Sequence, residues 1–263
     1  MIAVPVILQS LITTGVNLVD NIMLGQLTET ALSGSTQANQ FITLYTFVTM
    51  GISMGASVLS SRYWGARDLV SLKKIITIAL RFSLALALCF TAANVFFPQY
   101  IMSLYFQPDA VGEIAAGVTY LRWSTGCFVL MAISLVLTNI LRSMSLSAVP
   151  LLASACAFGI NIGANYVLIF GKLGFPAMGV AGAALGTFLA RIVETGVIMV
   201  SFFRNQRLRY RLKDILRPCK DLVMEFLRIS VPVMHRNRHV HCCKTDKHHL
   251  HGWHSPEDSN KHI

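Results

Sequence analysis

The sequence has few charged residues for its length, and this scarcity sets its class. Only 13% of its 263 residues are charged and 54% are hydrophobic, with a mean hydropathy of +0.58. A soluble domain carries about 25% charged residues, so a soluble globular fold is excluded. The six cysteines lack disulfide-framework spacing, and the apolar stretches contain no phosphate-binding loop, nucleophile elbow or metal-binding helix motif. We therefore expect an integral membrane protein that is not an enzyme and has no metal site or cofactor.

Six long apolar stretches predict an all-α membrane protein. Each has about 20 residues and few charges, which is the length that spans a bilayer. The stretches are residues 2–24, 38–59, 75–97, 117–141, 149–170 and 179–203. A seventh apolar run is too short to cross the membrane. We therefore expect a six-helix transmembrane lobe (1–203), a basic cytoplasmic linker (204–221), the truncated start of a seventh helix (222–234) and a tail (235–263).

The net charge of +10 is distributed by side of the membrane, which argues against nucleic-acid binding. Basic residues follow the second, fourth and sixth stretches, whereas Lys172 is the only basic residue in the connections on the opposite side. This alternation is the positive-inside pattern. It predicts a multi-pass protein of the cell membrane with a cytoplasmic N-terminus. Its expected partners are membrane lipids and not nucleic acid, and the pattern does not predict an oligomeric state.

The tail differs in composition from the rest of the chain. All eight histidines lie in residues 235–263, together with Cys242 and Cys243. Histidine and cysteine are the usual zinc ligands, but no paired motif of the required spacing is present. A non-native, disordered end explains the composition, and a metal-binding tail is the alternative.

Asp20 is the most informative polar residue, because it lies inside the first apolar stretch. An ionised aspartate in hydrocarbon costs about 2.5–3.5 kcal/mol, so such a residue usually faces a polar interior and has a function. Asn161 and Asn165 lie four residues apart on one helical face, and Thr187 lies in the sixth stretch. Together these oxygens suit a hard cation, or Asp20 takes up a proton. Hydrogen bonding between helices is the alternative role for the amides and the hydroxyl.

Two further patterns predict contacts inside the lobe. Arg191 and Glu194 are three residues apart in the sixth stretch, so we expect them to form a structural ion pair. Small residues recur at helical spacing and predict close approach of neighbouring helices. These residues are Gly51 and Gly55, Gly159 and Gly163, and Gly182 and Gly186.

Several short segments, in this order, resemble the N-terminal half of a multidrug and toxic compound extrusion (MATE) transporter. The segments are Pro5-Val-Ile-Leu-Gln9, Val19-Asp20-Asn-Ile-Met-Leu-Gly25, Gly51-Ile-Ser-Met-Gly55 with Ser61-Arg-Tyr-Trp-Gly65, Asn161-Ile-Gly-Ala-Asn165 and Gly179-Val-Ala-Gly182-Ala-Ala-Leu-Gly-Thr187. The resemblance implies one lobe of a twelve-helix antiporter, in which entry of protons or sodium ions drives export of amphipathic, often cationic, organic compounds. A lipid-linked precursor flippase of related fold and a fragment without transport activity are the alternatives.

The same resemblance assigns roles to single residues. Asp20 matches the aspartate that binds the coupling ion, and Asn161 and Thr187 match its partners. Pro5 matches a proline at which the first helix bends, although its place at the start of the stretch also suits a first-turn proline. Asn165 stands where some members have an aspartate. Three polar residues are candidates for the cleft wall, namely Gln9, Asn39 and Gln40.

Overall fold

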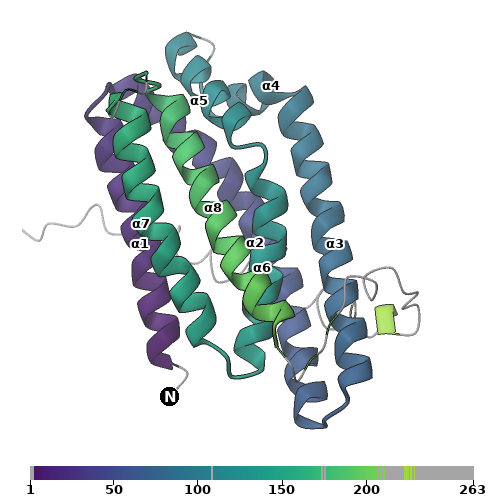
Figure 1. Ribbon diagram of the computed structural model, residues 1–263. Coiled ribbons are helices and arrows are strands. Elements are labelled where there is room, and N and C mark those ends of the chain that lie inside the picture. The colour runs from purple at the N-terminus through teal and green to yellow at the C-terminus, as the bar shows by residue number, and fades with distance from the viewer. Residues whose placement is uncertain are drawn as a thin grey trace, which may run out of the picture.

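The computed structural model describes residues 3–107, 109–172, 174, 176–205, 208, 210, 222–224, 226 and 228. Across these residues the chain forms eight helices and no strand. They are α1 (Ala3–Gly25), α2 (Glu29–Gly65), α3 (Leu69–Phe96), α4 (Pro98–Ser103), α5 (Val111–Trp123), α6 (Cys127–Ser143), α7 (Ala148–Phe170) and α8 (Val180–Phe203) (Figure 1).

The long helices stand side by side in an up-and-down bundle. α1 and α7 pack together at one edge, α3 forms the other edge, and α2, α6 and α8 lie between them (Figure 1). We call the end at which α1 begins the basal end and the opposite end the apical end. The short helices α4 and α5 lie at the apical end. α8 packs against α7, α6 and α5, and it therefore holds the two sides of the bundle together.

The helices have the length and composition of membrane spans. α1, α2, α3, α7 and α8 each contain an apolar window long enough to cross a bilayer, and the pair α5 and α6 forms a sixth if it is counted as one bent span. Large apolar side chains on the outside of the bundle, such as Ile7 and Leu11 of α1, are more than half exposed. Such a surface suits lipid or another apolar partner, not water.

The fourth span is broken, whereas the sequence predicted one continuous helix over residues 117–141. α5 and α6 meet at 59° across residues 124–126. Ser124 and Thr125 bond back to carbonyl groups of the preceding turn, a pattern that bends helices. Asn94 of α3 donates to the carbonyl oxygen of Leu121 at 2.8 Å and so satisfies a backbone acceptor next to the break.

α2 begins nine residues earlier than the predicted second span. Thr28 caps it, because its side chain accepts a hydrogen bond from the backbone N–H of Ala31 at 3.0 Å. Glu29 lies in the first turn, where a negative charge favours the helix. The connection that the hydropathy pattern indicated for residues 25–37 is therefore mostly helix.

The glycines of α8, and not those of α7, carry the close helix packing. A Cβ atom at Gly182 would lie 2.6 Å from the backbone oxygen of Leu168, so only glycine allows α7 to approach there. The prediction for Gly159 and Gly163 is wrong, since no described atom lies within 4 Å of a Cβ built at either position. Both glycines lie on the exposed face of α7, away from α8.

Some residues beyond α8 pack against the basal end. Tyr210 is buried, and its hydroxyl lies 2.8 Å from that of Thr77 in α3. Phe226 is buried and stacks on Phe82. The linker (204–221) and the seventh-helix start (222–234) therefore contact the lobe where they are described. The predicted tail (235–263) and its alternative metal site lie outside the described residues.

Candidate cation site in the helical bundle

The four residues predicted to bind a cation form one cluster near the apical end of α1. Asp20 is only 8% exposed, and Asn165 Nδ2 donates to its Oδ1 at 2.5 Å. The same Asn165 nitrogen lies 3.4 Å from Asn161 Oδ1, and Asn161 Nδ2 lies 3.5 Å from the hydroxyl of Thr187. The last two contacts are long. The cluster joins α1, α7 and α8, so Asp20 faces the interior of the lobe and not the lipid.

The local structure of α7 and α8 places these side chains. A spacing of four residues puts Asn161 and Asn165 one above the other on the face of α7 that meets α1 and α8. Gly186 of α8 packs directly against Asn165, whose backbone nitrogen would lie 3.2 Å from a Cβ at that glycine. A side chain at position 186 would overlap Asn165 Oδ1. The glycine therefore fixes the amide that holds Asp20.

Tyr120 also belongs to this cluster, and the sequence reasoning did not identify it. Its side chain is almost fully buried on α5, its hydroxyl donates to Asn39 Oδ1 at 3.3 Å, and the group also interacts with Thr187 and with the charge of Asp20. Asn39, a predicted cleft residue, is thus half-buried and tied to the site through Tyr120. Gln40 is exposed on the outer side of α2.

A second polar group lies nearer the basal end and holds four helices together. Gln9 of α1 donates to the hydroxyl of Ser154 at 3.0 Å and accepts from Arg142 of α6 at 2.7 Å. Ser154 donates in turn to Glu194 Oε1 at 3.2 Å, and Glu194 Oε2 pairs with Arg191 at 2.6 Å. The ion pair predicted from the sequence is therefore present. Gln9 is buried between these helices, and its place on a cleft wall stays a prediction.

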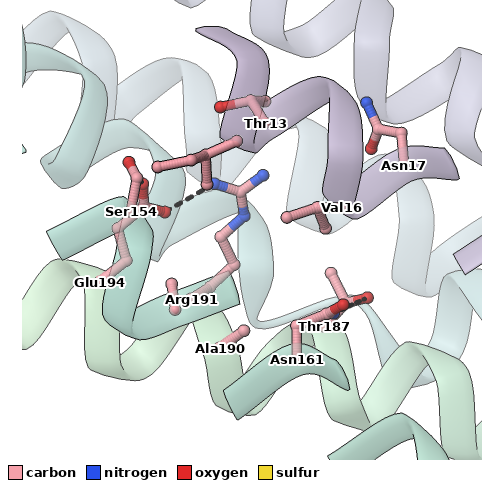
Figure 2. A pocket seen from close by; sticks show the side chains of 11 residues that line it. Thr13, Val16, Asn17, Ser154, Asn161, Thr187, Ala190, Arg191 and Glu194 are labelled. Carbon is pink, nitrogen blue, oxygen red and sulfur yellow. Dashed lines mark hydrogen bonds and ion pairs between the residues drawn. The ribbon is translucent and has the colours of Figure 1, made fainter. Parts of the chain in front are cut away.

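A small cavity of about 40 Å³ separates the two groups. Its wall includes Asn161 and Thr187 from the apical cluster and Arg191 and Glu194 from the basal group (Figure 2). Residues of α1, including Asn17, close the opposite side. The volume is sufficient for a few water molecules, and the wall offers several polar partners for them.

The chemistry of the apical cluster fits a hard cation or a proton. Its ligand atoms are a carboxylate, two amide oxygens and a hydroxyl, which are the oxygen donors that such cations prefer. Asn165 Oδ1 is buried and has no hydrogen-bond donor among the described side chains and backbone. This oxygen lies against Gly186 of α8, whereas the amide nitrogen faces Asp20, so a cation shared by Asp20 and Asn165 requires the amide to turn over. The donor set fits a hard cation or a proton on Asp20, and ion binding here stays a prediction.

Pro5 is the third residue of α1, close to the start of the helix. Proline is tolerated in the first turn because the N–H groups there have no partner within the helix. α1 is assigned as one helix from Ala3 to Gly25. Bending at Pro5 stays a prediction.

The fold and the site define a multi-pass helical membrane protein with a polar side-chain cluster buried in its interior. A model of the MatE family matches residues 5–167, and the chain belongs to this family. A relative in Thermotoga maritima, described as a probable multidrug resistance protein NorM, is 26% identical over 237 residues, which is 90% of this chain and 50% of the relative. The chain thus spans about half the length of the curated relatives it matches.

Solved structures share the fold. A MOP superfamily transporter from Pyrococcus furiosus, whose binding pocket is described as reversed in polarity with a different function suggested, superposes with a TM-score of 0.78 at 22% identity over 89% of this chain and 50% of that chain. A MATE crystal structure in a straight conformation gives a TM-score of 0.77 at 22% identity over 89% and 51% of the two chains. At these identities the likeness concerns the fold alone.

Proposed function

We propose that this chain is the N-terminal lobe of an ion-coupled antiporter that exports amphipathic, often cationic, organic compounds. The observation that carries the proposal is the buried carboxylate of Asp20, held by Asn165 inside an oxygen-lined cluster. A buried carboxylate of this kind in a membrane helix is expensive, and it is best explained by a role in binding an ion or a proton. The multidrug-resistance description of the Thermotoga relative supports the proposed substrate class.

The proposed cycle alternates between Asp20 with a bound ion or proton and Asp20 as a free carboxylate. Inward-moving protons or sodium ions neutralise the carboxylate, and release restores its charge. A bound ion or proton favours one packing of the lobe only to the extent that its affinities for the two packings differ. The helices around Asp20 are suited to this role, because α1 packs mainly on α7 and carries polar contacts at both of its ends.

The proposed location is the cell membrane, with the basal end in the cytoplasm. Where the structure describes them, basic residues lie at the basal end, at the α2–α3 and α6–α7 junctions and at Arg204 directly after α8. The positive-inside pattern favours this orientation. Membrane lipids are the proposed surroundings of the exposed apolar faces.

A lipid-linked precursor flippase is the weaker candidate. Such a protein needs cationic side chains that are available to a phosphate group. Arg191, the arginine that lines the described cavity, is already paired with Glu194 at 2.6 Å. The pairing leaves little net positive charge there.

The proposal is tested by dye efflux from a chimera. Residues 1–203 replace the matching half of the Thermotoga relative, and efflux of a cationic dye is followed in energised cells. Asp20→Asn should abolish efflux and leave insertion intact, whereas Asp109→Asn, which changes an exposed acid, should not affect it. Efflux that persists in Asp20→Asn, or a wild-type chimera without efflux, would contradict the proposal.

A further inference from the structure

Arg191 lies on α8 between Thr187 of the Asp20 cluster and Glu194, and the ion-coupling role proposed for Asp20 makes no use of it. Its Nη1 pairs with Glu194 Oε2 at 2.6 Å, and its side chain is 32% exposed. In the described part of the chain, Glu194 is its one hydrogen-bonding partner. A guanidinium group has five N–H donors, so most of its donor capacity is left for other groups.

The remaining part of this guanidinium group faces the cavity. Figure 2 shows Arg191 extending from α8 toward α1, with Thr187 and Asn161 on the wall nearest the apical cluster. Asn161 and Thr187 belong to the hydrogen-bonded cluster of Asp20, and Thr187 precedes Arg191 by one turn of α8, so this guanidinium group is the positive charge on the cavity wall next to that cluster. Charges interact more strongly across a poorly solvated interior than across water, so Arg191 does not need direct contact to act on the carboxylate of Asp20.

Glu194 connects the same arginine to the basal end. Its Oε1 accepts a hydrogen bond from Ser154, which accepts from Gln9, which accepts from Arg142 of α6. Donors and acceptors alternate without a gap along this chain of contacts. The hydrogen bonds of Glu194 are therefore continuous with the contact between α1 and α6.

We propose that Arg191 is a counter-ion shared by Asp20 and Glu194, and that through Glu194 it joins the Asp20 cluster to the polar contacts at the basal end. Two carboxylates then flank one arginine, and removal of either one leaves Arg191 with the other. Arg191 and Glu194 are positioning residues between the Asp20 cluster and the base of α1. The proposal holds whichever ion the proposed function gives to Asp20.

A double-mutant cycle on the purified chain tests this sharing. Asp20→Asn, Glu194→Gln and the double variant are compared with the wild type by their thermal unfolding midpoints in detergent. A shared counter-ion makes the two changes non-additive, because only the double variant leaves the partly buried arginine without a carboxylate. We expect the midpoint of the double variant to fall roughly 4 °C or more below the sum of the single effects.

Two controls make the result specific. The excess should vanish in an Arg191→Gln background, or in Arg191→Met if the glutamine variant does not fold. A cycle that combines Asp20→Asn with Glu113→Gln of α5 should be additive. Additivity of the Asp20 and Glu194 changes, or an excess that persists without Arg191, would overturn the proposal. Because the cycle reads stability, it can succeed even if the dye-efflux test of the antiporter fails.

Discussion

Replacing Gly186 by alanine probes the packing that holds the ion site together. A Cβ at this position would overlap Asn165 Oδ1 and lie 3.1 Å from Asn165 Cγ and 3.2 Å from its backbone nitrogen. The amide of Asn165 is also the donor to Asp20 at 2.5 Å. The substitution must therefore push α8 away from α7 or turn the amide away from Asp20.

The expected magnitude follows from three contributions. Overpacking of a filled contact costs about 1–3 kcal/mol. Loss of a hydrogen bond to a charged group costs about 1.5–3 kcal/mol. Alanine gains about 1 kcal/mol over glycine in helix propensity, which opposes both. The net destabilisation is about 1.5–5 kcal/mol, which should lower the unfolding midpoint by at least about 3 °C.

The measurement is thermal unfolding of the purified chain in detergent, followed by circular dichroism. Gly163→Ala is the matched control, because it is the same change in an adjacent helix and no described atom lies within 4 Å of the added Cβ. This control should unfold at the wild-type midpoint or slightly above it. If Gly186→Ala were as stable as Gly163→Ala, the packing of Asn165 against α8 would be wrong.

Three further changes test other parts of the lobe. Asn165→Asp adds a second carboxylate beside Asp20 and should tighten binding of ²²Na⁺ by at least about tenfold, roughly 1.4 kcal/mol; unchanged binding would argue against a cation cage. Thr28→Ala removes the cap of α2 and should destabilise the chain by about 0.5–2 kcal/mol in thermal unfolding, and a wild-type midpoint would contradict the capping role. Asn94→Leu removes two hydrogen bonds beside the break, to the Leu121 carbonyl and to the Thr125 hydroxyl, and should destabilise by about 1–3 kcal/mol; a wild-type midpoint would argue against support of the break by Asn94.

The sequence predicted the apical cluster well where its members follow helical spacing. Asn161 and Asn165 were placed on one face because four residues make about one turn. Ser154 lies on the same face two turns earlier, so the spacing could have identified it as well. Tyr120 could not be found in this way, because its position depends on how α5 packs beside α2 and α8.

Hydropathy predicted the number of spans better than their boundaries. A hydropathy window detects burial in lipid, whereas a helix continues until its backbone hydrogen bonds end. α2 therefore extends back to the Thr28 cap, beyond its most apolar part. Conversely, the break between α5 and α6 lies inside an apolar stretch, where Asn94 from a different helix supports it. A contact between distant segments of this kind is not visible in a local pattern.

The prediction of close helix contacts from the spacing of small residues was the least reliable one. Gly159 and Gly163 have the same spacing as Gly182 and Gly186, yet only the α8 pair meets another helix closely. The spacing shows that two glycines share a face but not which way that face points. The polar residues of α7 settle this, since Asn161 and Asn165 turn toward α1 and α8 and the two glycines then face outward.

Carbodiimide labelling of the purified chain, with the modified residue located by mass spectrometry, tests most directly whether Asp20 is a buried site for a proton or cation. Dicyclohexylcarbodiimide is apolar and reacts with protonated carboxyl groups inside membrane proteins. We predict modification at Asp20 and not at the exposed Asp109, with protection of Asp20 by sodium ions or by a rise in pH. An Asp20 that stays unmodified in the folded chain, or that is modified without protection by either condition, would contradict the account.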